Sequence, residues 1–169
     1  MSMGDRNEFV ARLFERNQRS LYRFLLRSTG RPDDAEDLTQ EVFLRVVRGA
    51  NGYQARGLER AWLFKIARNL LLDRARRDSS RPEPTPRAGV QEPSAEPRAL
   101  DVIALNQALR TLTPLEREAA VLRDVVGLSY SEIAQATETS VDAVAARIYR
   151  ARLGLRAVLL ARTESGSGD

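Results

Sequence analysis

The chain has 169 residues, a mass of 18.9 kDa and a formal net charge of +4. It contains no cysteine and no histidine, which excludes disulfides, zinc sites built from these residues, thiol nucleophiles and triads with an imidazole base. No apolar run approaches the roughly 18 residues of a membrane-spanning helix, and the first residues lack a signal-peptide pattern. We therefore expect a soluble cytoplasmic protein with no membrane insertion.

The charge is unevenly distributed along the chain. Residues 31–44 carry one basic and five acidic residues, whereas residues 45–81 carry ten basic and three acidic ones. Neighbouring regions of opposite sign indicate two surfaces with different partners. Of the 27 cations only Lys65 is a lysine, and guanidinium groups suit phosphate and guanine well, although a GC-rich genome explains an arginine bias equally well.

The first 80 residues predict three helices. Apolar residues recur at three-to-four spacing from Phe9 to Leu25, and the pair Arg31-Pro32 ends that helix. Asp33, with Glu36 three residues later, predicts a capping box for a second helix that ends at Gly49.

A third helix is predicted from about residue 58 to residue 77. Trp62, Ile66 and Leu70 form its apolar stripe. Five of the seven prolines then fall between residues 82 and 97, which predicts a flexible linker over residues 79–97. The linker divides the chain into a block of residues 1–78 and a block of residues 98–163, followed by a flexible tail at 164–169.

The second block carries clear helix starts. Residues 113–116 (Thr-Pro-Leu-Glu) and 129–132 (Ser-Tyr-Ser-Glu) both fit the capping box, and Gly127 stands between the two predicted helices. The second of these helices ends near Ala136, and Thr139 or Ser140 caps a longer last helix that runs to about Ala161. A short helix, a tight turn and a longer helix make a helix-turn-helix. Since no strand alternation occurs, we predict an all-α chain of two small helical domains joined by a Pro-rich linker.

The last helix is the strongest candidate for binding nucleic acid. Small residues let a helix approach the floor of the major groove, and arginines reach base edges and phosphates. A solvated arginine-rich helix is the simpler alternative, which the preceding short helix and turn make less attractive. The candidate residues are Ser140, Ala146, Arg147, Tyr149, Arg150 and Arg152.

The third helix of the first block is the second candidate. A basic helix with an aromatic residue can bind phosphates and stack unpaired bases. The alternative is that the cations are solvated and that Trp62 belongs to the core, which is where an indole at stripe spacing usually packs. The candidate residues are Trp62, Lys65, Arg68, Asn69, Arg76 and Arg77.

The acidic residues 33–41 suggest either a metal site or a protein-docking surface. Metal sites need carboxylates that converge from several elements, whereas these acids share one helix start, where the helix dipole favours anions. We therefore predict no metal, no cofactor and no catalytic residue. A docking surface on the exposed face of this helix is the better interpretation, formed by Asp37, Gln40, Glu41 and Arg45.

Taken together, the two blocks resemble the extracytoplasmic-function (ECF) group of bacterial sigma factors. Residues 34–45 resemble the helix with which sigma factors bind core RNA polymerase, and residues 61–69 resemble the helix that follows it in this group. Residues 127–134 and 146–152 resemble the C-terminal helix-turn-helix of the group. The order of these motifs, their spacing and the linker between them also match.

The resemblance implies roles and partners. The helix of residues 33–49 would dock on the β′ clamp helices of core polymerase, and the C-terminal domain would lie near the β flap. The loop of residues 51–58 and the third helix would recognise and melt the minus-10 element, with a melted base held near Asn69, Lys65 and Arg68. The last helix would enter the major groove of the minus-35 element, and an anti-sigma factor would hold the protein inactive.

The sequence departs from the group's pattern at two places. Glu138 stands in the turn where many relatives have glycine or another small residue, and a left-handed backbone is unfavourable for glutamate, so we expect this turn to differ. Asp142-Ala143 replaces a common Gly-Thr pair, which puts the promoter sequence in doubt. Two other functions would account for parts of the sequence. One is a helix-turn-helix regulator that never joins polymerase, and the other is a nuclease that uses the acidic cluster, which the missing convergent carboxylates disfavour.

Overall fold

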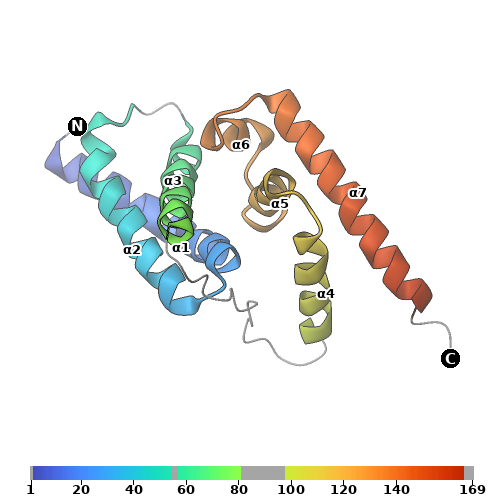
Figure 1. Ribbon diagram of the computed structural model, residues 1–169. Helices are drawn as coiled ribbons and strands as arrows, with labels where there is room; N and C mark the ends of the chain where they lie inside the picture. The colour runs from blue at the N-terminus through green and yellow to red at the C-terminus, as the bar shows by residue number, and fades with distance from the viewer. Residues whose placement is uncertain (1, 55–56, 81–97, 166–169) are drawn as a thin grey trace.

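The computed structural model describes residues 2–54, 57–80 and 98–165, and it contains no strand within these ranges (Figure 1). Residues 2–80 form what we call the N-terminal block, and residues 98–165 form the C-terminal block. The N-terminal block consists of α1 (Met3–Thr29), α2 (Pro32–Gly49), the 3₁₀ turn η1 (Ala50–Gly52) and α3 (Glu59–Ser79). The C-terminal block consists of α4 (Arg98–Arg110), α5 (Pro114–Ala120), the π-helical turn η2 (Val121–Val125), α6 (Tyr130–Ala136) and α7 (Val141–Ser165). The all-α prediction is confirmed.

Most helix ends lie where local sequence signals place them. The Thr113–Glu116 and Ser129–Glu132 capping boxes are both formed, and the Ser140 hydroxyl accepts a hydrogen bond from the amide of Ala143 at 3.1 Å. Each cap satisfies backbone amides that the first helical turn leaves unpaired. Helix α7 continues to Ser165 rather than ending near Ala161. The predicted linker lies outside the described residues from position 81 onward.

The capping box predicted at Asp33 is wrong. Helix α2 starts earlier, with Arg31 at the N-cap and Pro32 as its first residue, and no side chain caps it. Proline fits this position because its ring presets the helical φ and the missing N–H has no helical partner there. Asp33 and Asp34 consequently lie in the first turn, where the helix dipole favours their charge.

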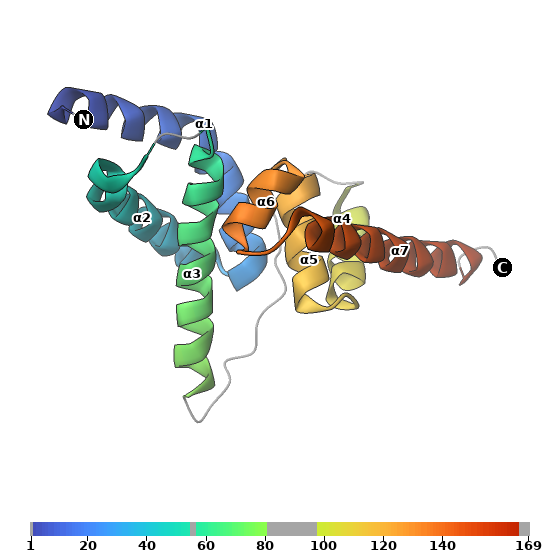
Figure 2. The same cartoon turned by 90° about the horizontal axis from the view of Figure 1, so that it is seen from above.

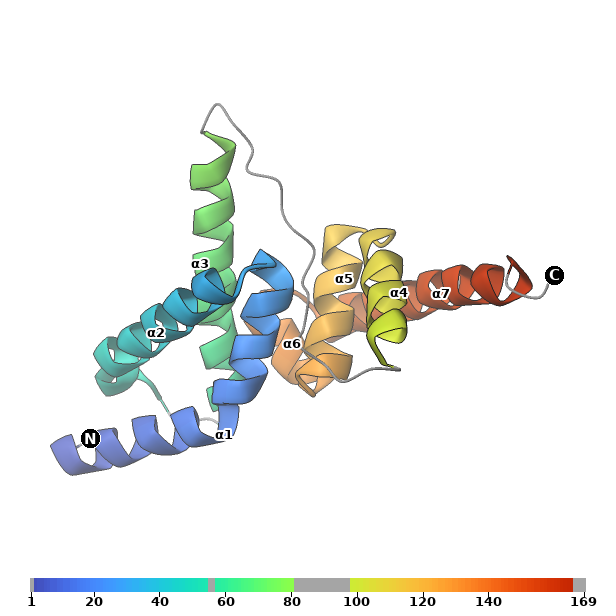
Figure 3. The ribbon, with the colours of Figure 1, turned by 90° about the horizontal axis from the view of Figure 1, so that it is seen from below.

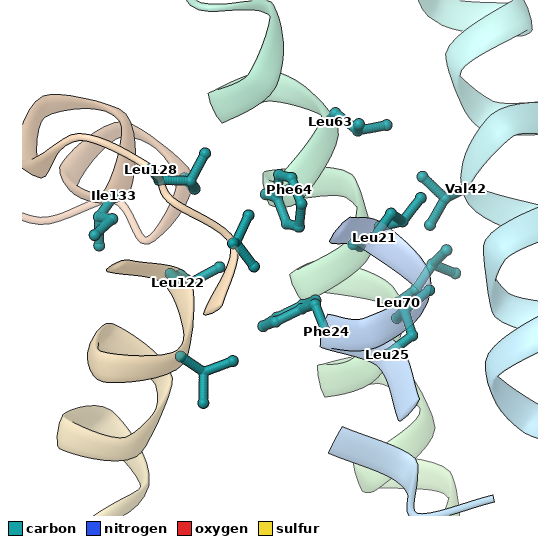
Figure 4. Close-up of a cluster of buried hydrophobic side chains, with 14 of the residues drawn as sticks. Leu21, Phe24, Leu25, Val42, Leu63, Phe64, Leu70, Leu122, Leu128 and Ile133 are labelled. Atoms are coloured by element: carbon teal, nitrogen blue, oxygen red, sulfur yellow. The ribbon is translucent and has the colours of Figure 1, made fainter. Parts of the chain in front are cut away.

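A single hydrophobic core joins the two blocks. Leu21, Phe24 and Phe64 of the N-terminal block and Leu122 and Ile133 of the C-terminal block belong to one cluster of buried residues (Figure 4). Helix α6 packs against α3, and η2 packs against α1. Burying apolar surface at about 25 cal/mol per Å² is the main stabilising term for such small units, so each block gains stability from the other.

Helix α7 extends away from this core. Figures 2 and 3 show α5 and α6 beside the N-terminal block, while α7 runs away from it toward the C-terminus. We call this packing of the two blocks the closed arrangement. None of the helices in the described ranges is long and apolar enough to cross a membrane.

Candidate polymerase and nucleic-acid interfaces

The predicted docking residues all lie on α2. Asp37 and Gln40 are exposed, while Glu41 and Arg45 are half-buried and form an ion pair with 3.0 Å between Oε1 and Nε. Leu44, one turn from Gln40, is a large apolar side chain left exposed. This combination of exposed apolar and polar side chains is typical of a surface that binds another protein.

The acidic residues before this surface have structural partners. Asp34 is only 19% exposed and forms an ion pair with Arg74 of α3, with 2.7 Å between the charged atoms. Arg31 approaches the same carboxylate at 3.7 Å. In the described part of the chain, no three acidic side chains gather as ligands for a metal ion.

Trp62 packs between aromatic neighbours. Its ring stacks on Tyr53 with centroids 4.6 Å apart, and Phe9 of α1 lies 6.4 Å away on a tilted plane. The indole is half-buried, so the structure supports much of the core interpretation of this residue. No sequence pattern singled out Tyr53, whose ring contacts Phe9 of α1 and Trp62 of α3.

Two of the predicted minus-10 residues form ion pairs with carboxylates of the C-terminal block. The Lys65 ammonium lies 2.8 Å from a carboxylate oxygen of Glu138, and Arg68 Nε lies 2.6 Å from a carboxylate oxygen of Glu118. The side chains of Arg68 and Glu118 are only 17% and 19% exposed. Both cations therefore face protein carboxylates in the closed arrangement, at the distance at which they would hold a phosphate.

The Lys65 hydrogen bond lowers the pKa of the Glu138 carboxyl below its ordinary value of 4.5. Because the carboxyl pKa is lower when the pair is formed, ionisation of Glu138 stabilises the closed arrangement at every pH above the ordinary carboxyl pKa. The contribution of this pair to the closed arrangement is therefore complete above about pH 4.5 and is lost as the pH falls through the lowered value.

The other predicted minus-10 residues lie further along α3. Asn69, Arg76 and Arg77 are exposed, and Arg76 approaches Asp73 of the same helix at 3.6 Å. The structure therefore divides the predicted set, because Lys65 and Arg68 face the C-terminal block while the other three face solvent.

The predicted minus-35 residues lie on α7. The Ser140 hydroxyl caps the helix. Ala146 and Arg147 are half-buried, whereas Tyr149 is 66% exposed. Arg150 Nε lies 3.2 Å from Glu116, whose pKa is lowered chiefly by the backbone amide of Thr113 and further by Arg150. A nucleic acid would have to displace such partners.

Arg152 makes a comparable contact. One of its guanidinium nitrogens lies 2.9 Å from Asp124, and both side chains are about half exposed. The hydrogen bond with Asp124 raises the pKa of Arg152, so this guanidinium stays charged at any physiological pH. Exposed pairs of this kind are weak, which leaves Arg152 available to a competing anion.

Arg60 ties the two blocks together and was missed by the sequence analysis. Its Nε donates to the side-chain oxygen of Asn17 at 3.0 Å, and one terminal nitrogen donates to the carbonyl of Val126 at 2.8 Å. Asn17 is 2% exposed and uses its amide nitrogen to bond the carbonyl of Leu13. Arg60 precedes the motif of residues 61–69, and no local pattern distinguishes it from the other arginines of the chain.

The expectation that Glu138 would alter the turn is wrong. Its backbone has a φ of 54°, so the left-handed conformation is kept despite the side chain. This conformation costs roughly 1 kcal/mol for a residue with a Cβ. The ion pair between Glu138 and Lys65 gives the side chain a partner across the block interface, which a glycine would lack.

The chain matches two family models in the expected order. Residues 13–81 match sigma-70 region 2, and residues 103–155 match sigma-70 region 4. It is 35% identical to the ECF sigma factor SigC of Mycobacterium tuberculosis over 73% of this chain and 69% of that protein. The chain belongs to the ECF RNA polymerase sigma factor family. SigM of the same species is 32% identical over 92% of this chain and 79% of SigM.

The ECF assignment extends to a longer relative and to solved structures. SigE of Mycolicibacterium smegmatis is 40% identical over 80% of this chain, which spans 56% of the SigE length. Among solved structures, RpoE of Bartonella quintana in complex with the anti-sigma factor NepR matches 92% of this chain and 96% of that one, with 25% identity and a TM-score of 0.75. CnrH in complex with the cytosolic domain of CnrY matches 92% of this chain and 90% of that one, with 28% identity and a TM-score of 0.67.

Proposed function

We propose that this ECF sigma factor joins core RNA polymerase in the bacterial cytoplasm and directs promoter-specific initiation. Helix α2 binds the β′ clamp helices, the loop before α3 together with α3 recognises and opens the minus-10 element, and α7 reads the minus-35 element. Catalysis belongs to the polymerase. The observation that carries the proposal is the succession of region 2 and region 4 in one chain, with the α2 docking surface exposed.

The decisive experiment is transcription in vitro with purified core polymerase and genomic promoter templates. We expect the chain to bind core and to start transcripts at discrete sites. Binding to DNA without binding to core would instead indicate a helix-turn-helix regulator. The match to region 2 disfavours that alternative, because a regulator of that kind needs no polymerase-binding domain.

The closed arrangement is, in this proposal, the inactive form. Lys65 and Arg68 cannot hold DNA phosphates while they pair with Glu138 and Glu118, so the blocks separate when the chain joins polymerase. The likeness to RpoE covers both blocks, and that sigma factor is held by an anti-sigma factor. We therefore include an anti-sigma factor among the partners of this chain, acting by stabilising the closed arrangement.

Arg147→Ala is expected to weaken promoter binding by about 1–3 kcal/mol, because a bidentate arginine contact with a base contributes that much discrimination. Among the described residues Arg147 has no side-chain ion pair, unlike Arg150 and Arg152, so of these three predicted minus-35 arginines it can read a base without first losing a protein partner. The measurement is the affinity of the holoenzyme for matched and scrambled minus-35 sequences. An equal loss on both sequences would reassign Arg147 to a phosphate contact.

Asn69→Ala is expected to impair promoter opening while core binding stays intact. Asn69 is exposed on α3, and an amide can hydrogen-bond an unpaired base edge, which repays part of the few kcal/mol lost on unstacking. Permanganate reactivity of thymines in the minus-10 element measures the opening. Normal reactivity with the alanine variant would remove Asn69 from the proposed pocket.

A further inference from the structure

Helix α1 carries five arginines at spacings of three or four residues. Residues so spaced lie on one face of a helix, with neighbouring Cβ atoms about 5–6 Å apart. Residues 16–29 contain four of these arginines and no acidic residue. We call the set the arginine row; its members are Arg12, Arg16, Arg19, Arg23 and Arg27.

Among the residues that the structure describes, the two ends of the arginine row have side-chain partners and its middle has none. Arg12 forms an ion pair with Glu8, and Arg27 donates a hydrogen bond to Asn106 of α4 at 3.3 Å. Arg16, Arg19 and Arg23 are exposed, and within the described residues they make no ion pair and no side-chain hydrogen bond. The nearest carboxylate along the helix is that of Glu15, which is exposed and also without such a contact.

Three unpaired cations in one row are unfavourable for the free helix, since like charges three or four residues apart repel each other. Of the other arginines proposed to bind DNA, three face carboxylates of another helix in the closed arrangement, namely Arg68, Arg150 and Arg152. The middle of the arginine row is thus a cationic surface that stays accessible while those residues are occupied.

The chemistry of the arginine row fits a phosphodiester backbone. From Arg16 to Arg23 the helix rises about 10 Å at 1.5 Å per residue, and duplex DNA carries a negative charge every ~1.7 Å of its axis. Between Arg16 and Arg23 the apolar Leu21 is fully buried and Tyr22 is half-buried, so this stretch has no exposed apolar centre for a protein partner. Guanidinium forks bind phosphate and carboxylate oxygens alike, so what favours a nucleic acid is the match between a row of cations and a regular row of phosphates.

The position of α1 connects the arginine row to the proposed minus-10 region. Phe9 stacks on Tyr53 with ring centroids 5.4 Å apart, so the first half of α1 lies against the beginning of the proposed minus-10 loop. Arg12 and Arg16 border a pocket of about 620 Å³ that Gly57 and Arg60 also line. The acidic Glu59 and Glu132 line this pocket as well, so the excess positive charge lies on the helix beyond it.

We propose that Arg16, Arg19 and Arg23 form a sequence-independent binding surface for the phosphodiester backbone of a nucleic acid. The surface is separate from the minus-10 and minus-35 contacts and is open in the closed arrangement. It therefore lets the chain hold nucleic acid before the two blocks separate. This inference does not rest on promoter recognition by α3 or α7.

The test compares the full chain with the R16Q/R19Q/R23Q variant. Fluorescence anisotropy measures binding to a 30-base-pair duplex and to a 30-nucleotide single strand of scrambled sequence, over a range of salt concentrations. We expect the variant to bind at least about tenfold more weakly at low salt, with the slope of log K against log salt reduced by about 2–3, since each phosphate contact contributes roughly 0.9. A loss confined to one of the two probes identifies duplex or single-stranded nucleic acid as the ligand.

Two controls separate the arginine row from a general charge effect. R16K/R19K/R23K keeps the charge and should retain most of the salt slope. R48Q/R110Q removes exposed arginines from α2 and α4 and should change the slope by much less. Unchanged affinity and slope in R16Q/R19Q/R23Q would overturn the proposal; if that variant fails to fold, the single variant R19Q, with an expected slope change of about 0.9, decides in its place.

Discussion

Phe64→Ala is expected to lower the free energy of unfolding by about 3–5 kcal/mol. Phe64 is 1% exposed, and its ring meets Phe24 edge-on with centroids 5.6 Å apart. Helix α6 covers the other side of α3, so the cavity left by the truncation would be bordered by both blocks. The loss therefore combines the transfer free energy of the ring with the cost of a cavity that neither block can close alone. Urea denaturation followed by far-UV circular dichroism measures it.

The shared core also predicts that Phe64→Ala lowers the stability of both blocks together. Trp62 is the only tryptophan, so its fluorescence reports on the N-terminal block, whereas circular dichroism reports on all helices. We expect both signals to move together in the wild type and in Phe64→Ala, as one cooperative transition. Leu72→Ala, at a side chain of α3 that is 39% exposed, is the matched control and should cost below about 1 kcal/mol. A separate, unshifted transition of the C-terminal block would contradict the shared core.

The sequence predicted the features that depend on neighbouring residues. The capping boxes at Thr113 and Ser129 need only four consecutive residues each, and both form as predicted. The start of α2 was misplaced because two local signals competed, and Pro32 at the first helical position prevailed over the carboxylate of Asp33. Such an error shifts a helix end by about two residues and leaves the fold class unchanged.

The interface between the blocks was not predictable in the same way. Arg60 and Val126 are far apart in sequence, and no periodicity relates a donor in one block to a carbonyl in the other. Glu138 was noticed only as a departure from a glycine-like turn, yet its carboxylate is what reaches Lys65. The basic residues of α3 were singled out for their charge, but no sequence pattern indicates that protein carboxylates pair with two of them, Lys65 and Arg68.

Glu118→Lys is expected to shift the chain from the closed arrangement toward separated blocks by about 3 kcal/mol, or roughly a hundredfold. The substitution removes the carboxylate 2.6 Å from Arg68 and places a second cation beside a guanidinium that is only 17% exposed. Removing one partner of a well-buried pair costs about 3–5 kcal/mol; the partial exposure here lowers that value, and the new repulsion restores part of it. Because the chain has no cysteine, Asn51→Cys and Ala157→Cys provide the only two labelling sites, at exposed positions of the two blocks. Single-molecule energy transfer between the two dyes then measures the population of each arrangement.

The charge-swapped pair is the control for Glu118→Lys. Arg68→Glu combined with Glu118→Lys restores opposite charges across the interface, so the energy-transfer distribution should return toward that of the wild type. The affinity for promoter DNA should separate the two variants further. Glu118→Lys separates the blocks and leaves Arg68 free to bind a DNA phosphate, so its affinity for the promoter should be retained. The swapped variant restores the closed arrangement and has a carboxylate at position 68, which repels a phosphate, so its affinity should fall. An unchanged energy-transfer distribution in Glu118→Lys would show that the apolar core alone holds the blocks together. The ion pair of Arg68 with Glu118 would then form as a consequence of the closed arrangement and would not stabilise it.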